Sequence, residues 1–147
     1  MFQKKRKFNP GFSLIEIMVV LGMISILAAA SFLNVSKKRN MINLEDAQAN
    51  LVTALEKARS NSQAGIGTLP HGVRIESNKF TVFEGNPAEG KTTVFPSSIL
   101  TNQSIPLNII FHRISGTSNA STIIIKNPSN GTEKIINIFQ DGRITTP

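Results

Sequence analysis

The stretch Gly11-Phe12-Ser13-Leu14-Ile15-Glu16 opens the part of the chain that decides the fold. It follows the basic run Lys4-Lys5-Arg6-Lys7 and leads into apolar sequence that extends to Leu33. The roughly 22 residues of this run are enough to cross a hydrocarbon layer as one helix. We therefore expect a basic leader over residues 1–11 and a transmembrane helix over residues 12–33.

Glu16 is the one carboxylate in this apolar run. On membrane-insertion scales a charged carboxylate costs about 2.5–3.5 kcal/mol at the bilayer centre, and less near the edge, so it needs a partner. No lysine or arginine occurs between residues 17 and 36 to supply one from the same helix. Glu16 is therefore the residue of this segment whose presence needs a functional explanation.

A second interpretation of the N-terminus is an ordinary secretory signal peptide. Ala28-Ala29-Ala30 supplies an A-x-A cleavage pattern, and cutting after Ala30 would release a soluble exported protein that begins at Ser31. The carboxylate of Glu16 and the absence of a helix breaker near Ala30 both argue against it.

The helix is expected to continue past the membrane, because no proline occurs between Pro10 and Pro70. Apolar residues recur there every three or four positions, which is typical of a helix with one buried face. These residues are Leu44, Ala47, Leu51, Ala54, Leu55 and Ala58. We predict an amphipathic extension over residues 34–64, ended by Gly65-Ile66-Gly67.

Residues 65–147 change to short β-rich runs separated by turn residues. The expected strands are Val73–Glu76, Lys79–Glu84, Thr92–Phe95, Leu107–Ile114, Thr122–Lys126, Glu133–Gln140 and Arg143–Thr145. Parallel strands would need crossover helices, and none is visible after Ala64, so the sheet should be mainly antiparallel. The expected fold class is α+β, with a long N-terminal helix followed by a β domain.

The amino-acid composition excludes several classes of functional site. The 147 residues include no cysteine, which excludes disulfides, thiolate metal sites and thiol nucleophiles. The net charge is +7, but residues 34–147 hold twelve basic against eight acidic residues, a mild and dispersed balance of +4.

No catalytic or cofactor motif is convincing. Gly85–Thr92 fits the phosphate-loop pattern G-x-x-x-x-G-K-[ST], but the helix that must follow is replaced by β-like sequence and Pro96, so we interpret it as a polar loop between strands. His71 and His112 are the only histidines and do not have metal-ligand spacing. We expect neither an enzyme nor a cofactor or metal site.

Residues 4–33 resemble the cleavage and methylation segment of type IV prepilins and type II secretion pseudopilins. The resemblance rests on the basic leader that ends in Gly11, on Phe12 as the next residue, and on Glu16 in an unbroken apolar helix. It implies that a prepilin peptidase cuts between Gly11 and Phe12 and methylates the new amino group of Phe12. An axial stagger between packed helices could then set that amine against Glu16 of a neighbouring subunit.

The C-terminal layout is similar to that of GspH/FimT-like minor pilins, through the segment Phe111–Gly116 and the closing Gly142-Arg143. Some members that take part in DNA uptake carry a C-terminal G-R-x-R motif, and here Thr145 stands in place of the second arginine. Arg143, Lys126 and Lys134 are the candidate DNA-contacting residues. The alternative is a hairpin turn at Asp141-Gly142 with Arg143 as an edge-strand charge.

The function expected from the resemblance is a minor pilin or pseudopilin subunit of a type IV pilus or a secretion pseudopilus. Its partners would be other pilin subunits, the prepilin peptidase, the assembly ATPase and platform protein, and the membrane. It would lie in the bacterial cytoplasmic membrane, with its C-terminal domain in the periplasm or outside, before entering a fibre. The alternatives are a DNA-binding minor pilin of natural transformation and the secreted soluble binding protein described above.

Overall fold

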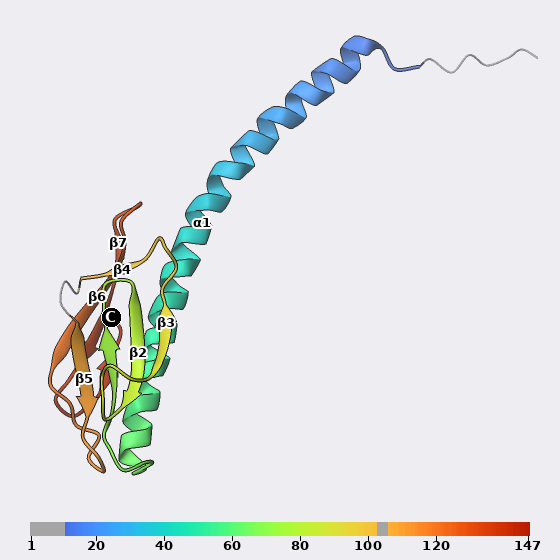
Figure 1. Ribbon diagram of the computed structural model, residues 1–147. Coiled ribbons are helices and arrows are strands. Elements are labelled where there is room, and N and C mark those ends of the chain that lie inside the picture. The colour runs from blue at the N-terminus through green and yellow to red at the C-terminus, as the bar shows by residue number, and fades with distance from the viewer. Residues whose placement is uncertain (1–10, 103–105) are drawn as a thin grey trace, which may run out of the picture. The chain divides into compact units, whose positions relative to one another are not determined.

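The computed structural model describes residues 11–102 and 106–147, without the side chains of residues 30–37. Its described part consists of one helix followed by eight strands (Figure 1). The chain divides into two compact units, Met1–Lys38 and Arg39–Pro147, and each is considered by itself. Helix α1 (Leu14–Gln63) contributes to both units.

The strands form two four-stranded sheets in the second unit. The first has the order β3-β2-β1-β5 and comprises Lys91–Val94, Lys79–Glu84, His71–Ile75 and Leu107–Phe111. The second has the order β4-β6-β7-β8 and comprises Leu100–Thr101, Ser121–Asn127, Thr132–Ile138 and Ile144–Thr145. Every pairing between these described strands is antiparallel, so the expected helix with antiparallel β structure is confirmed.

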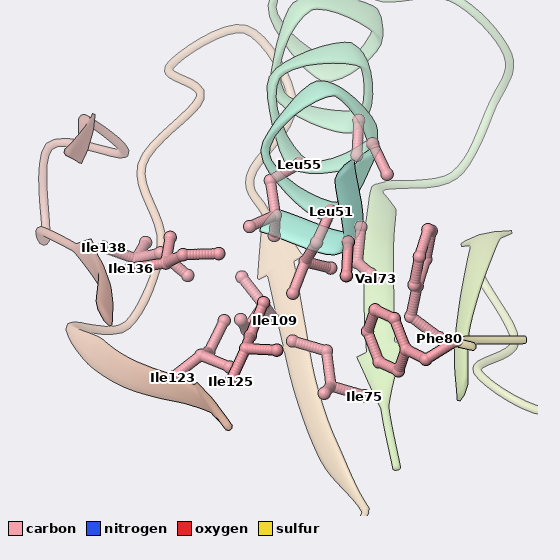
Figure 2. Packing of buried hydrophobic residues seen from close by; sticks show 14 of the residues in the cluster. Leu51, Leu55, Val73, Ile75, Phe80, Ile109, Ile123, Ile125, Ile136 and Ile138 are labelled. Atoms are coloured by element: carbon pink, nitrogen blue, oxygen red, sulfur yellow. The ribbon is translucent and has the colours of Figure 1, made fainter. Parts of the chain in front are cut away.

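The core lies between the second half of α1 and the inner faces of both sheets. Leu51 and Leu55 are fully buried, and the first sheet contributes Val73 and Ile75 from alternate positions of β1. Figure 2 shows side chains of both sheets converging on these two leucines. All six predicted core positions of the helix, at three- and four-residue spacing, are buried: Leu44, Ala47, Leu51, Ala54, Leu55 and Ala58.

Helix α1 ends in a Schellman motif. Gly65 has a positive φ of 66°, its amide donates to the Ser62 carbonyl, and the Ile66 amide donates to the Asn61 carbonyl at 3.0 Å. These are the two hydrogen bonds of that motif, in which glycine relieves the strain of the left-handed position. The predicted stop at Gly65 is therefore confirmed.

The end of α1 is tied to the loop that follows β5. The Ile114 amide donates to the Ser62 carbonyl at 2.9 Å, and Arg113 Nη2 donates to the carbonyls of Gly65 and Gly67 at 3.1 and 3.0 Å. Ile114 has a positive φ of 69°, which is unusual for a β-branched residue. Holding the loop against the helix end is the physical reason for this conformation.

Several predicted strand ends were wrong. The strand predicted over Leu107–Ile114 stops at Phe111, because the chain turns there to reach the end of α1. The strand predicted to reach Gln140 stops at Ile138, where a turn to β8 begins. β4 was not predicted: its two residues carry no alternation pattern, and pairing with β6 defines it.

Leu51→Ala should lower the free energy of unfolding of a fragment comprising residues 39–147 by about 2–5 kcal/mol, because it leaves a cavity where both sheets meet the helix. Urea denaturation would measure it. Ile42→Ala, at a position 45% exposed on the same helix, should change stability by less than about 0.5 kcal/mol. Equal effects of the two substitutions would contradict the placement of the core.

Candidate functional site: the N-terminal segment

Helix α1 begins directly after the predicted cleavage site. The Ser13 carbonyl accepts hydrogen bonds from the amides of Glu16 and Ile17 at 3.1 and 3.3 Å, and Ser13 Oγ accepts from the Glu16 amide at 3.3 Å. Serine at the cap with glutamate three residues later is the spacing of a capping box. Sequence reasoning missed this role of Ser13, although the S-x-x-E spacing could have revealed it.

The Glu16 carboxylate is exposed in the first turn of α1, where the partial positive charge of the helix N-terminus favours an acid. Within the described residues it has no hydrogen-bond or ion-pair partner. Phe12 and Glu16 line one shallow hollow of about 280 Å³, together with Ile17, Val20 and Leu21. The residue predicted to carry the new amine and the predicted acceptor therefore lie on the same open surface of the segment.

Gly11 is also exposed, and a Cβ built on it would meet nothing within 4 Å among the described atoms. The rest of the predicted leader, residues 1–10, lies outside the described residues. The described residues therefore leave the Gly11–Phe12 bond uncovered.

The first part of α1 exposes large apolar side chains of its own. From Phe12 to Leu27 their exposure runs from 49% at Val20 to 82% at Phe12. An apolar surface of this extent on one helix is covered in proteins by lipid or by other apolar helices.

Among the described residues, no helix meets both the length and the apolarity that a membrane span requires.

The structure does not bring the candidate DNA-contacting residues together. Lys126 and Lys134 lie on the neighbouring strands β6 and β7. Lys126 alternates with the buried isoleucines of β6 and so lies on the outer face of the sheet, whereas Lys134 lies on the same face as buried Ile136. The two lysines therefore occupy opposite faces of the sheet. Arg143 lies at the other end of β7, in the turn where its carbonyl accepts from the Phe139 amide and where Ile144 pairs with Ile138. The single patch expected of Arg143, Lys126 and Lys134 is therefore not formed.

Arg143 packs within its own turn. Its guanidinium carbon lies 4.4 Å from the ring centroid of Phe139, and its Nε lies 3.7 Å from Asp141 Oδ2. The Arg143 amide donates to Asp141 Oδ1 at 2.9 Å, and the amide of Phe139 donates to the Arg143 carbonyl at 2.9 Å. The predicted hairpin turn at Asp141-Gly142 is therefore present. The aromatic partner Phe139 was not foreseen.

The absence of a side chain at Gly142 allows two loops to pack closely. The φ of this glycine is +76°, and a Cβ there would lie 1.9 Å from the Gly116 carbonyl oxygen and 3.0 Å from Arg59 Nε. Arg59 Nη2 donates to the Asp141 carbonyl at 3.1 Å, which ties the β7–β8 turn to α1. Gly142 thus permits close packing of the two loops, whereas a Cβ on Gly116 would meet the Gln63 side chain of α1 at 2.5 Å.

Gly142→Ala should destabilise residues 39–147 by at least about 2 kcal/mol more than Gly131→Ala, as measured by urea unfolding. Gly131 has nearly the same φ, +70°, but its Cβ would meet nothing within 4 Å. The matched pair separates the cost of the backbone conformation from the cost of the clash. A difference near zero would contradict the close contact with Gly116.

The segment Gly85–Thr92 forms the loop between β2 and β3, at residues 85–90, and the first two residues of β3. Strand β3 begins at Lys91, where a phosphate-binding loop would begin a helix. Asn86 shapes the loop: its Oδ1 accepts from the Ala88 amide at 3.0 Å, and its Nδ2 donates to Glu89 Oε1 at 3.0 Å.

The two histidines lie near each other, because His71 of β1 pairs with Phe111 of β5, the residue before His112. His71 opens β1 and is buried, its amide donates to Ser62 Oγ, and its Nε2 lies 2.8 Å from the Ile66 carbonyl oxygen. His112 is exposed just after β5. Within the described residues, no group of three or more His, Asp or Glu side chains is placed to hold a metal ion.

The family model for the prokaryotic N-terminal methylation motif matches residues 6–32 of the chain. No curated protein and no solved structure matches the chain. The matched residues contain the capped start of α1, the exposed Glu16 and the apolar surface described above, whereas the β domain lies outside the match. The match supports a type IV prepilin-like N-terminal segment, and it covers residues 6–32 of the 147.

Proposed function

We propose that the chain is a minor pilin or pseudopilin subunit without enzymatic activity. The observation that carries the proposal is the methylation motif on a helix whose apolar side chains are exposed on all sides. Prepilin peptidase cuts between Gly11 and Phe12 and methylates Phe12, and residues 12–33 hold the subunit in the bacterial cytoplasmic membrane. The β domain then faces the periplasm or the exterior until the subunit enters a pilus or pseudopilus.

Burial of the apolar surface drives assembly in this proposal. A helix of this kind is stable in lipid, and it stays out of water when it leaves the lipid only if other apolar helices cover it. The fibre is then a bundle of such helices that carries the β domains outside. The assembly ATPase and platform protein, implied by the resemblance, supply the work of moving subunits from lipid into the bundle.

Glu16 selects the register between neighbouring helices. In a bundle of low dielectric an unpaired carboxylate is costly, and the amine created at Phe12 of a neighbouring subunit supplies the missing positive charge. The pair forms only at one axial stagger, so the wrong stagger leaves two unpaired charges. The exposed position of Glu16, without a partner in its own described chain, supports this role.

Mass spectrometry of the mature N-terminus tests the class of protein. In cells that contain prepilin peptidase, the expected first residue is N-methylated Phe12. A chain that begins with Ser31 would instead indicate the secreted soluble protein, and an intact Met1 would indicate an unprocessed membrane anchor. Either of those results would contradict the proposal.

Glu16→Gln should lower the amount of the chain recovered in sheared fibres, because the amide cannot pair with the ammonium group of a neighbour. Immunoblots of the fibre and membrane fractions would measure the change. Glu45→Gln, which removes an exposed carboxylate from the second half of the same helix, is the control and should assemble normally. If Glu16→Gln entered fibres as well as wild type, the register role would be wrong.

A further inference from the structure

Strand β3 leaves one edge of the first sheet open, because it is the last strand in the order β3-β2-β1-β5. The Phe95 amide donates to the Asn78 carbonyl on the β2 side at 2.9 Å. Alternate residues of an antiparallel strand point their N–H and C=O groups to the same side, so those of Thr93 also point to β2. The N–H and C=O groups of Thr92 and Val94 therefore point away from the sheet.

The side chains of β2 and β3 agree with this assignment. The hydroxyl oxygens of Thr81 and Thr92 lie 2.9 Å apart, as expected of a cross-strand pair that exchanges no main-chain hydrogen bonds. Among residues 11–102 and 106–147, the outward main-chain groups of Thr92 and Val94 form no other main-chain hydrogen bond. Val94 is also 65% exposed, so this edge is open to a partner.

A groove of about 380 Å³ lies beside this edge, between α1 and the strands β2 and β3. Its floor is apolar, with buried Ala54 and Phe80 and half-buried Val82. Lys57 of the helix and Lys91 of β3 line it, and both are exposed. Within the described ranges neither lysine forms an ion pair, so the groove combines an apolar floor with unpaired positive charge.

The open edge and the groove can be occupied by the same segment. Lys91 and Thr93 both line the groove, so the face of β3 that carries them is the one turned to α1. A strand added to β3 would place every second side chain on that face, beside these two residues. Its other side chains would lie next to exposed Val94 on the outer face.

We propose that β3 and this groove bind an extended segment of a different protein by strand addition. The segment forms main-chain hydrogen bonds with Thr92 and Val94, and its groove-facing side chains are apolar and acidic, with a carboxylate beside Lys57 and Lys91. The inference goes beyond the proposed function and uses the second unit alone, so its failure would leave that function untouched.

Charge favours a different protein over a second copy of the chain. Pairing β3 with β3 of another copy would bring two sets of Lys57 and Lys91 to one junction, and β3 itself carries no acidic residue. Like charges placed together across an interface penalise that arrangement. An acidic segment removes the penalty and supplies the missing partner.

Binding of a synthetic heptapeptide to the full-length chain in lipid nanodiscs tests the proposal. The end-blocked peptide has threonine at odd positions and isoleucine, aspartate and isoleucine at even positions, so one face of the strand is apolar and acidic. Surface plasmon resonance, with empty nanodiscs as reference, should show binding that weakens at least about fivefold when lysine replaces the aspartate. No binding at about 1 mM peptide, or equal binding of the two peptides, would overturn the proposal.

Val94→Pro tests the strand addition. It removes an amide that points to the open edge and is not used in pairing with β2, so the sheet should persist while peptide binding weakens at least about tenfold. Val94→Thr keeps the amide and should bind like wild type. Unchanged binding by Val94→Pro would contradict the use of this edge. Self-association of the chain that Val94→Pro abolishes would identify a second copy as the occupant and overturn the proposal.

Lys91→Glu tests the charge without changing the main chain. It should weaken binding of the aspartate peptide at least about fivefold and strengthen binding of the lysine peptide. Lys126→Glu makes the same charge change at an exposed position of the other sheet and should alter neither. Equal responses of the two variants would indicate unspecific attraction to a basic protein and would overturn the proposal.

Discussion

The β domain depends on the burial of one helix face by two sheets at once. Each sheet presents alternate apolar residues from its central strands, such as Val73 and Ile75 in β1 or Ile123 and Ile125 in β6. Both sets converge on the same stripe of α1, centred on Leu51. Without the helix, the apolar inner face of each sheet would be exposed to water, so the helix and the two sheets form one cooperative core.

This arrangement gives one helix two different apolar patterns. Its first part is apolar on all sides and carries the methylation motif, whereas its second part is apolar on one stripe and builds the core. The polar flank beside that stripe then remains available for contacts outside the domain. In the proposed function, processing and assembly therefore belong to the start of the helix, and the β domain is held at its end.

Regular spacing made the helix predictable, because a period of three to four residues gives a single buried face whatever surrounds it. The end of α1 was also predictable, since Gly65 supplies the left-handed position required there. The separate positions of Arg143, Lys126 and Lys134 could not be predicted, because strand phase and register decide the face on which a residue lies, and sequence neighbours do not fix them. The capping role of Ser13 could have been predicted from the S-x-x-E spacing. The stacking of Arg143 on Phe139 could not, because it depends on the geometry of a turn that only the structure supplies.

The ties at the end of α1 have a mechanical consequence. Arg59, Ser62 and Gly65 connect the last turns of the helix to the loop after β5 and to the turn before β8. Tension applied along the helix from its N-terminal side would reach these ties only after passing the whole helix–sheet contact. The domain would then be loaded in shear, with many contacts sharing the force, rather than peeled open one contact at a time.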